Sequence, residues 1–408
     1  MLLSTEQKNA VLLAMSRLLQ DRKAAILTAN RLDVQAAAEH PDRALFDRLH
    51  VDSAKIDGMS FALESVAAQP DPVGLILDQR TLSNGLRVVN RSVPFGTILI
   101  IYESRPDVTI EATSIAFKAG SRILLKGGRE AQRTNQVLFE TWQAALASQG
   151  LSGDWVSLLI LDRQQTEEFL ARPTERVDLI VPRGGAGLIA LVKKHATCPV
   201  LVSGRGNNFL FVERNADWEM TRSLIRNGKL QKVSACNSLD KVLFDEALPC
   251  LAEKVVELCR ELRTEGVSIW VDASLAKRLT GIPDSSMEPV WMPLDTSDRW
   301  DEEFLDYKLL MALVDDSSAA IRKINCHSGG HSATIVTDDH DVARSFMEAV
   351  DCAAVYHNAS TRFTDGGQLG LGAELAISTE KLHHRGPIGL EQLVSNKYYV
   401  YGNGQVRR

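Results

Sequence analysis

The apolar positions of the first 70 residues recur at helical spacing. The recurring positions include Val11, Leu12, Met15, Leu18 and Leu19. Such spacing places the apolar side chains on one face of a helix. Proline and glycine residues at 70–74 then interrupt the pattern, as these residues do at turns. The sequence therefore predicts an α-helical N-terminal region that ends near residue 70.

Continuous apolar runs and helical patterns alternate from residue 96 to residue 200. The runs expected to form buried strands lie at 97–102, 123–125, 158–161 and 178–181. The helical patterns lie at 110–119, 132–149 and 188–195. This alternation predicts a parallel sheet with helices on both faces. We expect a second α/β stretch at 230–355.

Two strand-like segments stand apart from this alternation. Residues 80–89 contain the Asn84-Gly85 step, which is a strong hairpin signal. Residues 397–401 near the C-terminus read Lys-Tyr-Tyr-Val-Tyr. A lone two-stranded hairpin is only marginally stable in water, so these segments need a partner. Pairing with another subunit is one solution.

Composition narrows the class of protein. A chain of 408 residues is too long for one ordinary compact core, so two domains are expected. A net charge of −6 argues against nucleic acid as the main ligand. No run approaches the roughly 20 apolar residues that a membrane helix needs, and the first residues lack a secretory-signal pattern. Six widely spaced cysteines without a CxxC pair indicate reduced thiols, as in a cytoplasmic enzyme.

Two glycine-rich turns follow predicted strands, one at 126–130 and one at 181–187. Glycine allows backbone amides to approach an anion closely, and a helix N-terminus adds a favourable dipole. Neither turn has the GxGxxG or P-loop spacing, and taken alone each is more often a plain strand-to-helix connection. Because Lys126, Arg129 and Arg183 accompany them, the two turns together suggest a nucleotide-phosphate site.

Cys236 is the cysteine whose surroundings favour reactivity. The residues after it, 237–243, are expected to start a helix, whose oriented N–H groups would lower the pKa of the thiol. The alternative is a buried cysteine that fills the core, which is the more usual role of an arbitrary cysteine.

A polar loop at 355–367 follows another predicted strand and contains one arginine, Arg362. A guanidinium in such a loop suits a carboxylate or a phosphate. His327 and His331 lie four residues apart, but Gly329 and Gly330 between them interrupt any helix. No third ligand stands at metal-binding spacing, so a zinc site is not expected.

The chain resembles the γ-glutamyl phosphate reductase (glutamate-5-semialdehyde dehydrogenase) family of the aldehyde dehydrogenase superfamily. The matching segments lie at 70–74, 93–96, 102–108, 126–131, 182–185, 236–237, 354–374 and 383–387. The Glu-Ser-Arg-Pro string at 103–106 and the Asn-Ala-Ser-Thr-Arg-Phe-Thr-Asp-Gly-Gly string at 358–367 are the most specific. The resemblance covers essentially the whole chain.

This resemblance implies an aldehyde-dehydrogenase-like α/β fold with three parts. An NADPH-binding domain of the Rossmann type would take 1–76, 96–228 and 366–395. An α/β catalytic domain would take 229–365, and a small oligomerisation β-ribbon would take 77–95 and 396–408. The two isolated strand segments fall in that ribbon. A homo-oligomer is therefore expected.

The resemblance also implies the reaction. The superfamily nucleophile aligns with Cys236, whose thiolate would attack L-glutamyl 5-phosphate and release phosphate from a thioester. NADPH would reduce the thioester to glutamate 5-semialdehyde, which closes to pyrroline-5-carboxylate in the second step of proline biosynthesis. A glutamate kinase that supplies the acyl phosphate is a candidate partner.

Site residues follow from the matching positions. The implied cofactor contacts are Lys126, Gly127, Gly128, Arg129, Pro182, Arg183, Gly184, Gly185 and Glu303. The implied substrate contacts are Arg105, Ser360, Thr361 and Arg362. Asp107 stands where the superfamily has an asparagine that donates to the oxyanion, and an ionised carboxylate cannot donate. The backbone N–H of Cys236 would then carry more of that role.

Other positions refine the expected activity. Hydrolytic aldehyde dehydrogenases have a Glu that activates water, and its position corresponds to residues 202–204 of this chain. No carboxylate stands there, and this absence favours reduction over hydrolysis. Arg129 replaces a Glu of NAD-preferring relatives and suits a 2′-phosphate. Many relatives have Pro-Gly before Cys-Asn, where this chain has Ser234-Ala235. A Gly-Asn-Cys-His-like segment appears here as Gly-Asn-Asn-Phe at 206–209.

Three alternatives remain at this point. The nearest is an NAD(P)-dependent aldehyde dehydrogenase that acts on another acyl aldehyde. The second is a cysteine hydrolase or acyltransferase that pairs Cys236 with His331 or His357. The third is an oligomeric relative that keeps the fold without catalysis.

Overall fold

The computed structural model describes residues 2–38, 46, 48–202, 204–280 and 290–407. The chain forms two compact units. Unit 1 comprises Met1–Ser203, Gly370–Ala376 and Pro387–Arg408, and unit 2 comprises Gly204–Leu369 and Ile377–Gly386. No helix in the described ranges combines the length and the apolar character needed to cross a bilayer.

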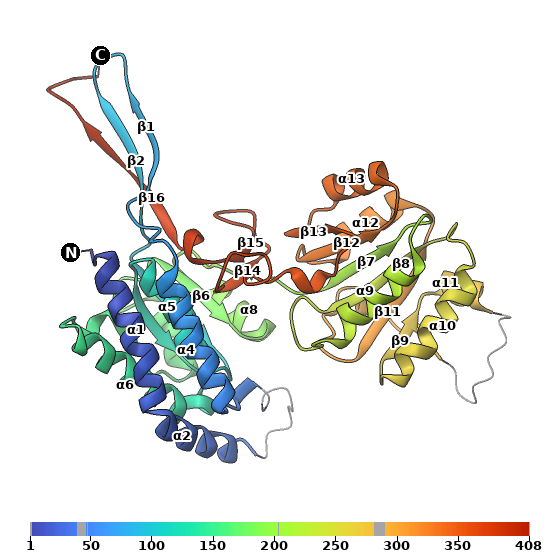
Figure 1. The fold of residues 1–408 in the computed structure, drawn as a ribbon, viewed down its shortest axis with the longest axis horizontal. Helices are drawn as coiled ribbons and strands as arrows, with labels where there is room; N and C mark the ends of the chain where they lie inside the picture. The colour runs from blue at the N-terminus through green and yellow to red at the C-terminus, as the bar shows by residue number, and fades with distance from the viewer. Residues whose placement is uncertain (1, 39–45, 47, 203, 281–289, 408) are drawn as a thin grey trace. The chain divides into compact units, whose positions relative to one another are not determined.

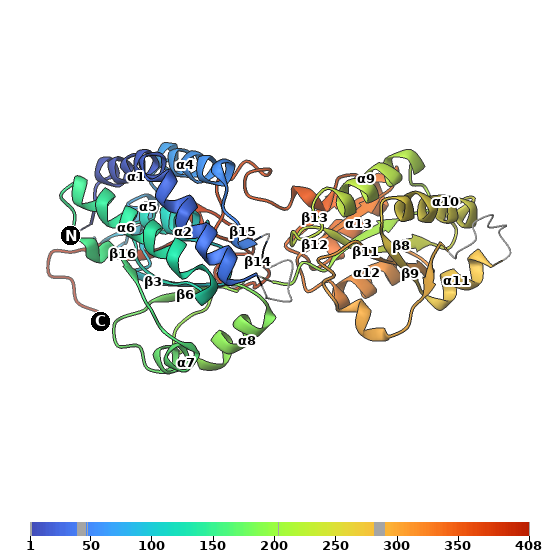
Figure 2. The same cartoon turned by 90° about the horizontal axis from the view of Figure 1, so that it is seen from below.

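Unit 1 is built on a parallel sheet with the strand order β5-β4-β3-β6. Its strands are β3 (Thr97–Tyr102), β4 (Arg122–Lys126), β5 (Val156–Leu158) and β6 (Leu179–Arg183). The helices are α1 (Thr5–Asp21), α2 (Lys23–Ala36), α4 (Ser53–Ala68), α5 (Val108–Lys118), α6 (Gln132–Ser148), α7 (Arg163–Ala171) and α8 (Ala186–His195). Helices α7 and α8 lie on the opposite face of the sheet from the others (Figure 2).

Side-chain alternation along the strands explains the two helical layers. Ile98 and Ile100 of β3 pack into one apolar cluster with α1, α4, α5 and α6. Leu99 and Ile101 pack into the other cluster, with Phe169 of α7 and residues of α8. Successive residues of a strand point to opposite faces, so a strand that is buried throughout needs helices on both sides.

Unit 2 has a seven-stranded parallel sheet in the order β10-β9-β11-β8-β7-β12-β13. Its strands are β7 (Asn208–Val212), β8 (Leu239–Asp245), β9 (Ser268–Val271), β10 (Met292–Pro293), β11 (Lys308–Val314), β12 (Ser332–Val336) and β13 (Ala354–His357). Helices α9 (Trp218–Leu230), α10 (Leu251–Thr264) and α11 (Ala273–Leu279) cover one face, and α12 (Ser317–His327) and α13 (His340–Ala349) cover the other. A further short sheet pairs β14 (Ala376–Ser378) with β15 (Gly386–Ile388).

The two isolated strand segments pair with each other. Strands β1 (Ile76–Thr81) and β2 (Arg87–Pro94) form a hairpin, and β16 (Val394–Tyr401) lies antiparallel along β2. Together they make a three-stranded ribbon that extends from the rest of unit 1 (Figure 1). The partner that each isolated strand segment needs is therefore supplied, at least on one side, by the other segment of the same chain.

The α/β class and the parallel sheets predicted from the sequence are confirmed. The boundary between units differs from the expected domain boundary, because residues 204–228 lie in unit 2 and not with the predicted NADPH-binding domain. The physical reason is that β7 is hydrogen-bonded between β8 and β12. The assignment of NADPH binding to one domain and of catalysis to the other remains a prediction.

Gly96 between β2 and β3 offers a test of this packing. Its φ is +120°, and a Cβ there would lie 2.2 Å from Oδ2 of Asp178, which accepts the N–H of Thr97. We expect Gly96→Ala to lower the free energy of unfolding by about 1–3 kcal/mol in urea denaturation. Gly58, in the exposed middle of α4, has no atom within 4 Å of its would-be Cβ. Gly58→Ala should instead stabilise by about 1 kcal/mol, and equal effects of the two changes would contradict the reasoning.

Candidate active site

Cys236 lies in a turn between α9 and β8 and is half-buried. The prediction that a helix starts after it is wrong, because residues 239–245 form strand β8. This run is buried at every position and is paired on both sides, with β7 and with β11. An apolar run of this kind fits a central parallel strand better than a helix. The polarity around the sulfur therefore has another source than a helix N-terminus.

The side-chain amide of Asn208 holds the backbone of this turn. Its Nδ2 lies 2.7 Å from the carbonyl oxygens of Cys236 and Ser238 and 2.8 Å from that of Gly206. Asn208 is fully buried, and a primary amide has two N–H groups, so the three acceptors share two donors. The turn that carries the nucleophile candidate is thus tied to the start of β7.

Asn208 is itself held in place by Ser332 and His331. The Ser332 hydroxyl donates to Oδ1 of Asn208 at 2.5 Å, and Nδ1 of His331 lies 2.9 Å from the same oxygen. His331 is completely buried, and burial lowers its pKa to about 4, so the ring is neutral at physiological pH. The Nε2 atom of His357 faces the carbonyl of Thr337 at 2.9 Å. His357 thus uses Nε2 on a backbone carbonyl, whereas His331 is a neutral ring whose Nε2 is buried without a hydrogen-bond partner among the described residues.

Asn237 joins the cysteine turn to the predicted substrate loop. Its Nδ2 donates to the carbonyls of Arg362 (3.2 Å) and Thr364 (2.9 Å). The Thr361 hydroxyl donates to the carbonyl of Asn237 at 2.9 Å. Ser360 and Thr361 are both buried, and Oγ of Ser360 accepts the N–H of Arg362. The structure thus brings Ser360, Thr361 and Arg362 to Cys236, with both hydroxyls already used to shape the loop.

Arg362 supplies a positive charge next to the sulfur. Burial lowers the pKa of its guanidinium, and the negative charges of Cys236 and Asp365 act in the opposite direction. Nε donates to Gln231 at 3.0 Å, whereas Nη1 is buried and has no hydrogen-bond partner among the described residues. Because the attraction is mutual, the guanidinium favours the thiolate form of Cys236. Its unpaired buried donor is suited to an incoming anion.

Other cysteines have apolar or unremarkable surroundings. Burial raises the pKa of Cys259 to about 12 and that of Cys352 to about 11. Burial also raises the pKa of Cys198. A thiol with a raised pKa is a poor nucleophile at neutral pH, so Cys236 keeps its place as the reactive candidate. No three His, Cys, Asp or Glu side chains in the described ranges come together as metal ligands.

Glu303 lies at the cysteine turn as well. Its carboxylate accepts the backbone N–H of Gly206, while burial raises its pKa. Gly206 in turn touches Cys236 so closely that a Cβ there would lie 1.7 Å from the Cys236 carbonyl oxygen. Glu303, an implied cofactor contact, is therefore close to the nucleophile candidate within unit 2.

The two glycine turns lie at one edge of the unit 1 sheet. Strands β4 and β6 flank β3, and parallel strands end at the same edge. The first turn begins at Lys126, the last residue of β4, and continues through Gly127 and Gly128 into the short 3₁₀ helix η1 (Arg129–Ala131). The second turn follows Pro182 and Arg183 at the end of β6, and Gly185 is the N-cap of α8.

Two carboxylates that sequence reasoning missed occupy these turns. Glu103 accepts the N–H of Gly185 at 3.0 Å, and Glu130 accepts from the backbone and the hydroxyl of Ser104 at 2.6 and 2.8 Å. Burial lowers the pKa of Lys126, and both carboxylates oppose this shift. An N–H group that donates to an internal carboxylate is also suited to donate to a phosphate oxygen. Glu103 and Glu130 lie in the segments 103–106 and 126–131 that match the family, and this match is the signal in the sequence that could have found them.

Arg105 and Asp107 form an ion pair at the start of α5. Nη2 of Arg105 lies 3.1 Å from Oδ2 of Asp107, while Oδ1 of Asp107 is buried without a partner among the described residues. Burial and the charge of Asp107 raise the pKa of Glu111, one turn further along α5. Arg105 and Arg183 act in the opposite direction. Glu111 was also missed, although its spacing of four residues from Asp107 places both carboxylates on one helix face.

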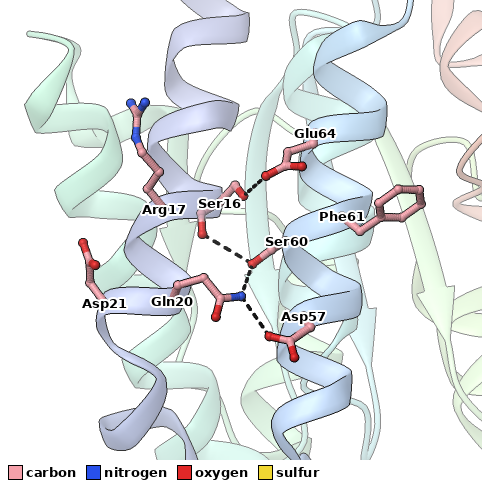
Figure 3. A pocket seen from close by; sticks show the side chains of 8 residues that line it. All are labelled: Ser16, Arg17, Gln20, Asp21, Asp57, Ser60, Phe61 and Glu64. Carbon is pink, nitrogen blue, oxygen red and sulfur yellow. Dashed lines mark hydrogen bonds between the residues drawn. The ribbon is translucent and has the colours of Figure 1, made fainter.

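A groove between α1 and α4 contains none of the predicted site residues (Figure 3). Gln20 donates to Asp57 and Ser60, and Ser16 donates to Glu64. Since these polar side chains satisfy one another across the two helices, the groove serves the packing of unit 1.

The fold and the site together define a class of protein. One α/β unit has glycine turns at the carboxyl edge of its sheet, the other presents a cysteine in a polar turn, and the fold is that of solved aldehyde dehydrogenases. The acetylating aldehyde dehydrogenase of Geobacillus thermoglucosidasius shares the fold, with a TM-score of 0.67 at 16% identity over 100% of this chain and 94% of that chain.

Within this class, the chain belongs to the γ-glutamyl phosphate reductase family. A family member from Koribacter versatilis is 42% identical over 405 residues, which cover 99% of this chain and 95% of the relative. One from Clostridium beijerinckii is 37% identical over 410 residues, with 99% and 95% covered. The crystal structure of γ-glutamyl phosphate reductase from Thermotoga maritima matches with a TM-score of 0.92 at 38% identity, over 100% of this chain and 95% of that chain. No protein-family model matches the chain. The resemblance predicted from the sequence is confirmed.

Gly206 provides a test of the cysteine turn. The methyl group of Gly206→Ala would meet the backbone carbonyl of Cys236, so the turn must move. We expect turnover and the alkylation rate of Cys236 with iodoacetamide to fall about 100-fold, as a displacement of about 1 Å commonly causes. Gly58→Ala, in α4 of unit 1, should leave both rates unchanged. An unchanged alkylation rate in Gly206→Ala would show that the turn is not fixed by this contact.

Proposed function

We propose that this protein is an NADPH-dependent reductase that converts L-glutamyl 5-phosphate to L-glutamate 5-semialdehyde and phosphate. The relatives at about 40% identity over the whole chain are named for this reaction. The semialdehyde closes to pyrroline-5-carboxylate, so the reaction is the second step of proline biosynthesis from glutamate. The observation that carries the proposal is Cys236 in a fixed polar turn beside the charge of Arg362.

The chain's own residues account for the acylation step. The Cys236 thiolate attacks the acyl carbon, the bond from that carbon to the phosphate oxygen breaks, and a thioester remains on Cys236. Arg362 stabilises the thiolate before attack, and its buried Nη1 offers a donor to an anionic end of the substrate. Arg105, paired with Asp107, is a second candidate for that role. The backbone N–H of Cys236 supports the developing oxyanion.

The unit 1 turns fit a nicotinamide dinucleotide. Gly127 and Gly184 leave no room for a Cβ, with Asn135 and Glu103 at 2.2 and 2.3 Å, so a side chain at either position would displace the turn. The Gly185 N–H at the α8 N-terminus, which holds the Glu103 carboxylate, is suited to a phosphate. When bound, NADPH supplies the hydride that reduces the thioester.

Arg129 is the reason to prefer NADPH over NADH. It stands in η1 directly after the two glycines of the first turn, and it is exposed. A guanidinium binds a phosphate with two parallel hydrogen bonds, whereas NAD-preferring relatives have a carboxylate here for the ribose hydroxyl. Glu303, at the cysteine turn, is the proposed contact to the nicotinamide ribose.

The alternatives are less well supported. A cysteine hydrolase or acyltransferase has no use for the two glycine turns of unit 1, and the relatives are named as reductases. The segment 202–204 has no carboxylate in the sequence, and Ser203 within it lies outside the described residues. An aldehyde dehydrogenase for another acyl aldehyde has no support from the relatives, which share the γ-glutamyl phosphate reductase name.

The ribbon supports a homo-oligomer. Strand β1 is exposed along its whole length, and β1 and β16 are the two edges of the three-stranded sheet. Ile76, Leu77, Tyr398, Val400 and Tyr401 are exposed apolar side chains on them. Exposed apolar edge strands are sites of pairing with a further chain. We propose a second copy as that chain, a glutamate kinase as a further partner, and the cytoplasm as the location.

Phosphate dependence tests the proposed reaction. With pyrroline-5-carboxylate as the source of the semialdehyde, NADP⁺ reduction should require phosphate, because phosphate resolves the thioester. Cys236→Ser should lower turnover by at least about 10³-fold, since a hydroxyl is a far weaker nucleophile than a thiolate at neutral pH, while NADPH binding by fluorescence persists. Phosphate-independent oxidation, or a fully active Cys236→Ser variant, would overturn the proposal.

Arg362→Lys tests the substrate loop. A lysine keeps the charge but loses the planar fork, so KM for the acyl phosphate should rise about tenfold or more. The change in kcat should be smaller, and NADPH affinity should stay the same. Arg344→Lys, on the exposed face of α13, is the matched control. An unchanged KM in Arg362→Lys would remove this residue from substrate binding.

A further inference from the structure

Three ionisable side chains that the proposed reaction does not use are buried together in unit 2. Lys229 of α9 and Asp240 of β8 form an ion pair of 3.0 Å, and Lys241 follows Asp240 in the strand. Each is at most 1% exposed. Burying charges is costly, and a buried pair is weak evidence for stability as such. Their hydrogen bonds show what they hold.

All three contact the backbone of the segment 302–306, which precedes β11. The ammonium of Lys241 donates to the carbonyl of Glu302 at 2.8 Å. The second carboxylate oxygen of Asp240 accepts the N–H of Phe304 at 2.9 Å, and Lys229 donates to the carbonyl of Asp306 at 3.1 Å. The segment is thus anchored at both ends and in the middle.

Glu303 stands between the first two anchors. Its carboxylate accepts the N–H of Gly206, and its position follows from the fixed residues on either side of it, Glu302 and Phe304. Lys241 also lies 3.8 Å from the ring centroid of Phe304, a cation–π distance. The charge of Lys241 favours the ionised form of Glu303, since it acts to lower the pKa of that carboxyl.

We propose that Lys241, together with the Lys229–Asp240 pair, is a positioning residue that fixes Glu303 for contact with the cofactor ribose. This inference rests on the proposed function, in which Glu303 is a cofactor contact. Lys241 is the informative member, because its removal leaves the Lys229–Asp240 ion pair intact. Burial lowers the pKa of Lys241 to about 8, so most of it is charged at pH 7.

A double-mutant cycle separates positioning from general support of the fold. Lys241→Met keeps the length of the side chain but loses the ammonium. We expect the NADPH Kd, measured by fluorescence titration, to rise about tenfold, within the range for directly coupled residues. Glu303→Gln should raise the Kd as well, and Lys241→Met should add nothing in that background. The alkylation rate of Cys236 should stay at the wild-type value in Lys241→Met.

Lys8 provides the matched control. It is a buried lysine of α1, 1% exposed, whose ammonium lies 2.5 Å from Asp71. Lys8→Met should lower the thermal midpoint without changing the NADPH Kd. If Lys241→Met does not fold, Lys241→Gln completes the cycle, because its amide is a donor without charge.

The outcomes distinguish the two proposals. Additive effects of Lys241→Met and Glu303→Gln, or an unchanged Kd in Lys241→Met alone, would overturn the positioning role and leave the proposed function standing. An unchanged Kd in Glu303→Gln would remove Glu303 as a cofactor contact, and the inference with it. Phosphate-dependent turnover of the wild type reports on the proposed function independently.

Discussion

The cysteine turn depends on one buried amide. Asn208 stands at the start of β7 and its Nδ2 faces three backbone carbonyls, of which one belongs to Cys236. An unpaired buried carbonyl costs about 1–3 kcal/mol, so this arrangement disfavours any other path for the turn. Ser332 and neutral His331 fix the orientation of the amide through its oxygen. The nucleophile candidate is therefore positioned by long-range hydrogen bonds and not by its neighbours in sequence.

This constraint explains how a cysteine that precedes a strand acquires a polar setting. A helix N-terminus would have supplied oriented N–H groups, but β8 follows instead. The charge comes from Arg362, which Asn237 brings to the sulfur by binding the carbonyls of the arginine loop. Nucleophile and cation thus share one framework of side-chain-to-backbone hydrogen bonds. A change in any member is expected to affect both.

Sequence patterns predicted the elements better than their contacts. The run at 97–102 is β3 as expected, whereas the strand expected at 158–161 is β5 at 156–158, because only those residues pair with β4. The expected helix after Cys236 failed because a short apolar run does not by itself distinguish helix from strand. The segments that carry the site were found from the resemblance. The sequence did not reveal the roles of Asn208, Glu103 and Glu130. Their hydrogen bonds join residues that lie 26 to 124 positions apart along the chain.

Two departures from the family pattern fit together in this structure. Ser234-Ala235 precedes Cys236 where the resemblance led us to expect Pro-Gly, so the turn lacks the fixed φ of a proline. Asn208 stands in a segment that resembles Gly-Asn-Cys-His, at the place of the cysteine. A thiol is a weak donor, whereas an amide donates strongly to carbonyls. The Asn208 amide restrains the turn through its hydrogen bond to the carbonyl of Cys236, and the ring of Phe209 next to it stacks on Trp300 with 6.4 Å between the ring centroids.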